Sequence, residues 1–89
     1  MAYNAKNLSV LAYANGFTLW HYTTPDAATA VDASGYFNGA ADMVRIGDMV
    51  LANTDTGAGY ASGVFVVAAN ANGVVDVANM VQFNGTNSR

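Results

Sequence analysis

Residues 64–77 read VFVVAANANGVVDV, and this stretch decides the fold. Two Val-rich runs flank residues 70–73, and valine suits strands. Between the runs, Asn72-Gly73 is a dipeptide that two-residue hairpin turns favour, because both turn positions need a positive φ. The stretch therefore predicts an antiparallel hairpin with strands over 64–69 and 74–83.

A second Asn-Gly dipeptide, at residues 15–16, lies in the stretch 9–23. A two-residue loop there predicts a hairpin that pairs Ala14 with Phe17, Ala12 with Leu19 and Val10 with His21. The alternative is a short helix over 8–14 that ends at Gly16. The hairpin is favoured because β-formers flank the turn dipeptide.

The overall composition favours strands. The chain has no Glu and few Leu or Lys, so strong helix formers other than Ala are scarce. We predict an all-β fold, a small antiparallel β-barrel or sandwich, with another strand over 45–53. An Ala- and Gly-rich connection over 24–42 is expected to contain a short helical turn, between Phe37 and Val44. Alternation within the strands predicts a core of Leu19, Val44, Ile46, Val50, Val64, Val66, Val75 and Val77.

The length indicates one domain over 1–89, with an extended arm over 1–7 and a frayed tail over 84–89. A domain of this size has a thin core and usually needs reinforcement. With no cysteine and one histidine, disulfides, thiolate metal sites and multi-histidine sites are excluded within one chain. Association with a partner or with further copies is the reinforcement that remains.

Charge is scarce, which bears on partners. Only 10% of the residues are charged, against about 25% in an average domain. A surface so poor in charge is expected to be partly hidden in contacts. A net charge of −3 with three basic residues argues against nucleic-acid binding. No signal peptide and no apolar run near 18 residues is present, so we expect cytoplasmic synthesis and no membrane contact.

The stretch NTDTGAGYASG, residues 53–63, raises the question of catalysis, because Asp55-Thr56-Gly57 is found in small dimeric aspartic proteases. Such an enzyme needs a second aspartate about 3 Å away. Asn53 and Thr54 separate Asp55 from the apolar part of the preceding strand, and only 32 residues follow Gly57, too few for the flap and second half of such a protease. We predict a strand-ending loop in which Asp55 and Thr56 bond nearby backbone. The glycine spacing also fails the phosphate-loop templates.

Other polar residues give no catalytic, cofactor or metal site. His21 has no Ser or Asp placed locally to work with it, so a structural role is expected. Gly47-Asp48 predicts a bend at which Asp48 bonds exposed backbone. The six Asp residues form no D-x-D-x-D-G calcium loop. No cofactor is expected.

The stretch FTLWHY, residues 17–22, carries bulky groups on both faces of a strand. Phe17, Leu19 and His21 share one face, and Thr18, Trp20 and Tyr22 share the other. Either both faces are buried within this chain or another chain covers one of them. Aromatic residues are enriched at interface cores. The residues expected to contact a partner are Trp20, Tyr22 and, from the arm, Ala2, Tyr3, Asn4, Lys6 and Asn7.

The runs NLSVLAYANGFTLWHYTT, GYFNGAADMVRIGDM and GVFVVAANANGVVDV cover most of the chain. They resemble small virion proteins of tailed bacteriophages, in particular marine and alphaproteobacterial phages. The resemblance implies a head decoration, or cement, protein without enzymatic activity. Such a protein binds the major capsid protein on the outside of the virion, often as a trimer. A tail or fibre component and a ligand-binding module are the alternatives, and a dimeric aspartic protease using Asp55 is a remote one.

Overall fold

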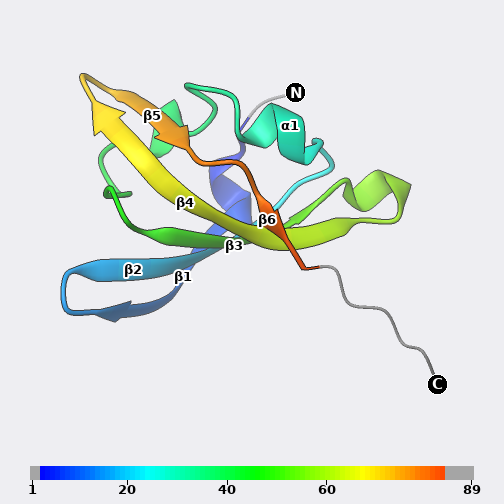
Figure 1. Cartoon of the computed structure of the whole chain (residues 1–89), viewed down its shortest axis with the longest axis horizontal. Helices are drawn as coiled ribbons and strands as arrows, with labels where there is room; N and C mark the ends of the chain where they lie inside the picture. The colour runs from blue at the N-terminus through cyan, green and yellow to red at the C-terminus, as the bar shows by residue number, and fades with distance from the viewer. Residues whose placement is uncertain (1–2, 84–89) are drawn as a thin grey trace.

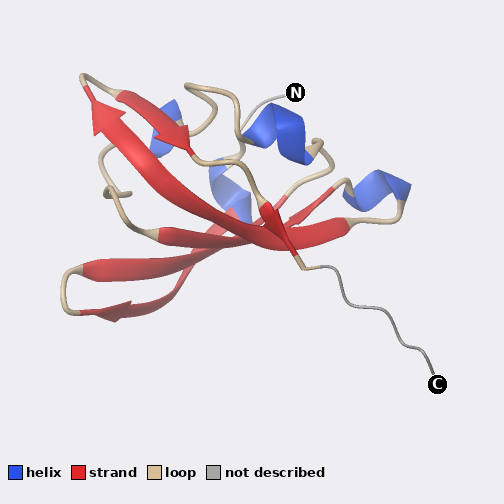
Figure 2. Cartoon of the chain, viewed as in Figure 1, coloured by secondary structure: helices blue, strands red, loops and turns tan. Residues whose placement is uncertain are grey.

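The computed structural model describes residues 3–83 and has an all-β fold, as predicted (Figures 1 and 2). The strands are β1 (Leu8–Ala14), β2 (Phe17–Thr23), β3 (Met49–Thr54), β4 (Ala61–Ala71), β5 (Val74–Val77) and β6 (Val81–Gln82). The helical elements are short, namely α1 (Ala28–Val31) and the 3-10 turns η1 (Ala5–Asn7), η2 (Asn38–Ala40) and η3 (Thr56–Ala58). η2 lies within the range predicted for a helical turn, whereas α1 was not predicted.

The strands form one sheet in the order β1-β2-β3-β4-β5, with β6 beside β4. Every pair is antiparallel except β2–β3, which is parallel. Parallel neighbours need a long crossover connection, and residues 24–48 supply it. The sheet does not close. The fold is sandwich-like, with the crossover, rather than a second sheet, as the other layer (Figure 1).

Both predicted Asn-Gly hairpins are confirmed. Asn15 and Gly16 have φ values of 54° and 87°, and Asn72 and Gly73 have 55° and 79°. These left-handed pairs match the turn whose twist suits a hairpin. The helix alternative for residues 8–14 is wrong, because this segment is β1.

The β1–β2 register differs from the prediction at one end. Ala14 pairs with Phe17 and Ala12 with Leu19, as expected, but Val10 pairs with Trp20 and not with His21. A register shift between Val10 and Ala12 explains the difference, because a bulge there adds one residue to β1.

The core lies between the sheet and the crossover. Buried side chains from the sheet are Trp20, Tyr22, Val50, Ala52, Phe65, Val67, Val75 and Val77, and the crossover adds Val31, Phe37, Ala40 and Val44. Four of the eight predicted core residues are thus confirmed: Val44, Val50, Val75 and Val77.

The other four predicted core residues are not buried. Leu19 and Val64 are half-buried and Val66 is exposed, all on the opposite sheet face, and Ile46 is exposed in a loop. In VFVV both alternating phases are apolar, so alternation alone could not choose the inward phase of β4.

A buried carboxylate joins the starts of β2 and β3. Asp48 Oδ1 accepts from the Thr18 amide at 3.0 Å, and Oδ2 accepts from Trp20 Nε1 at 3.1 Å and the Arg45 amide at 3.0 Å. The predicted role of Asp48 at a bend is confirmed. β3 begins at Met49, later than predicted, because Asp48 closes a turn on the Arg45 carbonyl.

Candidate functional site

The sheet face away from the crossover is the candidate site, and we call it the open face. Strand pairing arranges its side chains in rows across the sheet. One row is Ala12, Leu19, Met49 and Val66, and the next is Ser9, His21, Leu51, Val64 and Val81. A third row, Thr23, Asn53 and Ser62, is polar. The open face therefore changes from apolar to polar along the strands.

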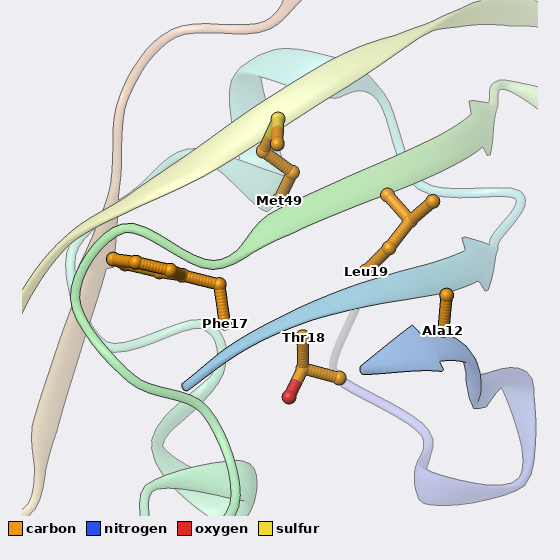
Figure 3. Close-up of a pocket in the computed structure, with 5 residues that line it drawn as sticks. All are labelled: Ala12, Phe17, Thr18, Leu19 and Met49. Carbon is orange, nitrogen blue, oxygen red and sulfur yellow. The ribbon is translucent and has the colours of Figure 1, made fainter. Parts of the chain in front are cut away.

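At the apolar end, Ala12, Phe17, Thr18, Leu19 and Met49 line a hollow of about 170 Å³. Figure 3 shows the side chains of Phe17, Leu19 and Met49 on one side of the strands and Thr18 pointing to the other. The Phe17 side chain is 56% exposed although it is large and apolar. Such a hollow suits an apolar group from a partner.

The β1–β2 hairpin extends this apolar surface. Val10, Leu11 and Tyr13 on β1 are exposed. Val10 and Tyr13 pair with Trp20 and Thr18, so they lie on the core side of the sheet. The hairpin projects beyond the crossover layer (Figure 1). We call Val10, Leu11, Tyr13 and Phe17 the hairpin tip, and it is apolar on both faces.

The edge formed by β1 has few features that prevent pairing with other strands. Natural edges are blunted by charges, prolines or bulges. β1 (Leu8–Ala14) has a bulge but neither charge nor proline. This edge continues the apolar surface of the hairpin tip.

Trp20 and Tyr22, predicted to contact a partner, lie in the core. Trp20 is 6% exposed and Tyr22 0%, because the crossover of the same chain covers their face. The expected partner role does not fit this burial. Phe17, Leu19 and His21 occupy the opposite face of β2, which is the open one.

The predicted N-terminal arm is docked on its own chain over the residues that the structure describes. The ring of Tyr3 stacks on Tyr22 at 5.8 Å between centroids, and the main-chain amide of Asn4 donates to Tyr22 Oη at 3.0 Å. Asn4 and Lys6 are exposed and Asn7 is half-buried, so their contact with a partner stays a prediction. Ala2 lies outside the described residues.

A chain of hydroxyl groups links this segment to the crossover. Tyr36 Oη donates to Asp26 Oδ2 at 2.7 Å and lies 2.9 Å from Tyr22 Oη. Because the Tyr36 proton is directed at Asp26, Tyr22 is the donor to Tyr36. Burial, as the largest cause, raises the pKa of Tyr36 above its ordinary value, and the hydrogen bond that Tyr36 donates to Asp26 raises it too; burial also raises the pKa of Tyr3. The network stabilises the neutral tyrosines and holds the crossover on the sheet.

The Asp55-Thr56-Gly57 motif forms a loop between β3 and β4, as predicted. Main-chain groups make its contacts, since the Asp55 amide donates to the Asp26 carbonyl at 2.9 Å and the Thr56 amide to the Thr24 carbonyl at 3.3 Å. His21 is half-buried on the open face. Within residues 3–83, no three His, Cys, Asp or Glu side chains gather as metal ligands. No helix in that range could span a bilayer.

The sequence interpretation missed the open face as a site, and it missed Met49 and Val66 within it. The two-faced pattern of residues 17–22 was the available signal, but it does not say which face the crossover covers. Comparisons with protein-family models, curated proteins and solved structures gave no match.

Proposed function

We propose that the chain is a structural virion protein of a tailed bacteriophage that binds the outside of the capsid shell. In this role it decorates and stabilises the head and has no catalytic task. The observation that supports the proposal is the group of exposed apolar side chains at the apolar end of the open face and at the hairpin tip. Exposed apolar patches mark interaction sites. Because the sequence resembles small virion proteins, the major capsid protein is the partner that we propose for this surface.

The size of the surface favours attachment by several copies. Complete burial of one large apolar side chain is worth about 1.5–3 kcal/mol. The Phe17, Met49 and Val66 side chains are already partly covered, so each contributes less. Association costs about 4–15 kcal/mol. One copy is therefore expected to bind weakly, and a trimer would bind much more tightly because its second and third contacts are intramolecular.

A tail or fibre component is the second candidate, and the same surface supports it. Its apolar residues would then contact a tail protein and not the shell. An image of the purified particle separates the two roles, because density on the head or on the tail assigns the location directly.

The remote protease alternative depends on Asp55. In the structure Asp55 has a φ of 53° and its amide contributes to the contacts that hold the loop against residues 24–26. If the parent protein cleaved peptides and an Asp55→Asn variant did not, the result would support the aspartic protease alternative.

Reconstitution on particles that lack the protein tests the proposal. The double variant Phe17→Ser/Met49→Ser removes two apolar groups from the hollow, and Ile46→Ser is the matched control, because Ile46 is exposed in a loop outside the open face. We expect the parent protein and the control to bind heads and the double variant to lose occupancy. Binding should survive about 1 M salt, where the Debye length is about 3 Å, because apolar contacts are not screened.

Full occupancy by the double variant would contradict docking through the open face. Release of the parent protein by salt would contradict apolar attachment and favour the Asp residues and Arg45. Each variant is first shown to be folded by its cooperative unfolding, so that lost occupancy is not caused by lost structure.

A further inference from the structure

The polar end of the open face holds a groove that the docking proposal does not use. It lies where β2 and β3 end, and Thr23, Asn53, Thr56 and Tyr60 line it. Its volume is about 350 Å³, larger than the hollow at the apolar end. An occupant of this groove would meet one aromatic ring and three neutral polar side chains.

Tyr60 is held in an unusual way for an exposed residue. Its φ is 65°, in the left-handed region that bulky residues rarely adopt, and its side chain is 70% exposed. The Tyr60 amide donates to the Asp55 carbonyl at 2.9 Å and closes the loop. The exposed ring gains little packing in this chain that would offset its backbone strain. Strain of this kind clusters at sites that bind ligands.

Asn53 lines the same groove as this ring, and its side-chain amide is held in place. Ser62 Oγ donates to Asn53 Oδ1 at 2.6 Å, which sets the orientation of the amide. Asn53 Nδ2 has no hydrogen-bond partner within residues 3–83, and neither do the hydroxyls of Thr23 and Thr56. These three groups are available as donors and acceptors to a bound molecule.

The lining selects a class of ligand. Arg and Lys, the usual partners of phosphate and carboxylate, are absent from it. Ligand sites combine apolar or aromatic walls with a few placed polar groups. A sugar ring matches this lining, because its C–H face can stack on an aromatic ring while its hydroxyls take the polar groups. We propose that this groove binds a neutral saccharide, with Tyr60 as the stacking platform and Asn53 as the orienting donor.

Titration with saccharides, followed by amide NMR of the whole chain, tests the proposal. The probes are glucose, galactose, N-acetylglucosamine and an oligosaccharide of each. We expect millimolar binding by at least one, with shifts confined to the Asn53 side-chain amide and the backbone around Thr56 and Tyr60. Stronger binding of an oligosaccharide than of its monomer would indicate a glycan polymer as the source, and equal binding would indicate a free sugar.

The variant Tyr60→Gly removes the ring and suits the left-handed backbone. We expect it to abolish the shifts while its unfolding midpoint stays the same or rises, since Gly relieves the strain. Tyr13→Ser is the matched control, because Tyr13 is 63% exposed at the hairpin tip, and it should keep the shifts. Occupancy on particles should not change in Tyr60→Gly, so this test is independent of the docking proposal.

Three results would overturn the saccharide site. They are the absence of local shifts with every probe, shifts that persist in Tyr60→Gly, and a lowered unfolding midpoint in that variant. The last result would show that the Tyr60 ring stabilises the fold and is not kept for a ligand.

Discussion

The two faces of the sheet carry similar apolar residues, but one face is buried and the other is partly exposed. On β4, Val67 is 1% exposed and faces the core, while its neighbour Val66 is 37% exposed on the open face. β2 shows the same contrast between Trp20 and Leu19. Apolar character therefore does not determine burial here. The crossover determines it, because it covers only one face.

Polar anchors fix the crossover to the covered face. Asn70 Nδ2 donates to the carbonyls of Ala41 and Val44 at 2.8 and 2.7 Å. Asn38 Oδ1 accepts from the Val75 amide at 2.8 Å. These partly buried hydrogen bonds join residues 26 to 37 positions apart in the sequence and help hold the crossover on the covered face.

The largest expected effect is a contrast between neighbours. Val67→Asp places an unpaired charge in the core, which costs several kcal/mol and should abolish cooperative unfolding. Val66→Asp points to solvent and should change the free energy of unfolding by less than about 1 kcal/mol. Urea unfolding followed by circular dichroism compares the two. The sequence placed Val66 in the predicted core, where an aspartate would unfold the chain, and its position on the open face reverses that expectation.

If both Asp variants unfolded the chain, the open face would have to be buried in the folded state. If both stayed folded, the crossover would not form a core. Only the asymmetric outcome agrees with one covered and one open face.

The second effect concerns two aspartates. Asp48→Ala leaves the Thr18 amide, the Arg45 amide and Trp20 Nε1 without their acceptor. An unsatisfied buried group costs about 1–3 kcal/mol, so a loss of about 3 kcal/mol or more is expected. Asp76→Ala is the control, because Asp76 is half-buried and its side chain makes no hydrogen bond within the described range. Equal unfolding midpoints for the two variants would show that the Asp48 contacts do not hold β2 to β3.

The third effect is a loss of stability at alkaline pH. Burial raises the pKa of Tyr36 above the ordinary value of 10 and also raises that of Tyr3. A tyrosine whose folded pKa is raised stabilises the folded state fully below pH 10 and loses this contribution as the pH rises above 10. Thermal unfolding midpoints should therefore fall above about pH 10. Tyr36→Phe should reduce the slope, and an unchanged slope would remove Tyr36 as a cause.

Much of the fold could be predicted from local chemistry. The two Asn-Gly turns, the strands around them and the bend at Asp48 follow from residues near each other in sequence. The parallel β2–β3 pair could not be predicted, because it depends on where the crossover returns. The bulge that shifts Val10 to Trp20 left no distinct pattern either.

The site was less predictable than the fold. Alternation showed that β2 has two bulky faces, but which one is covered depends on contacts between segments far apart in sequence, such as the hydrogen bond from Asn70 to Ala41, 29 residues apart. The interface was therefore expected on Trp20 and Tyr22. The groove at Tyr60 depends on a positive φ at a tyrosine, and this residue type does not indicate one.

The smallest expected effect is on the stability of the isolated chain after a change at Phe17. Phe17 is more than half exposed, and its ring lies over Gly47, where a Cβ atom would approach Phe17 Cε1 to 2.8 Å. Phe17→Ser therefore removes contacts to one turn and should lower the free energy of unfolding by less than about 1 kcal/mol. Phe65→Ser, at a fully buried position, should cost at least the roughly 3–5 kcal/mol typical of Phe→Ala in cores. Urea unfolding at low protein concentration measures both changes on the monomer. A large loss of unfolding free energy for Phe17→Ser under those conditions would place Phe17 in the core and remove it from the docking surface. A small loss, together with reduced self-association at high concentration, would show that its apolar area serves contacts between molecules.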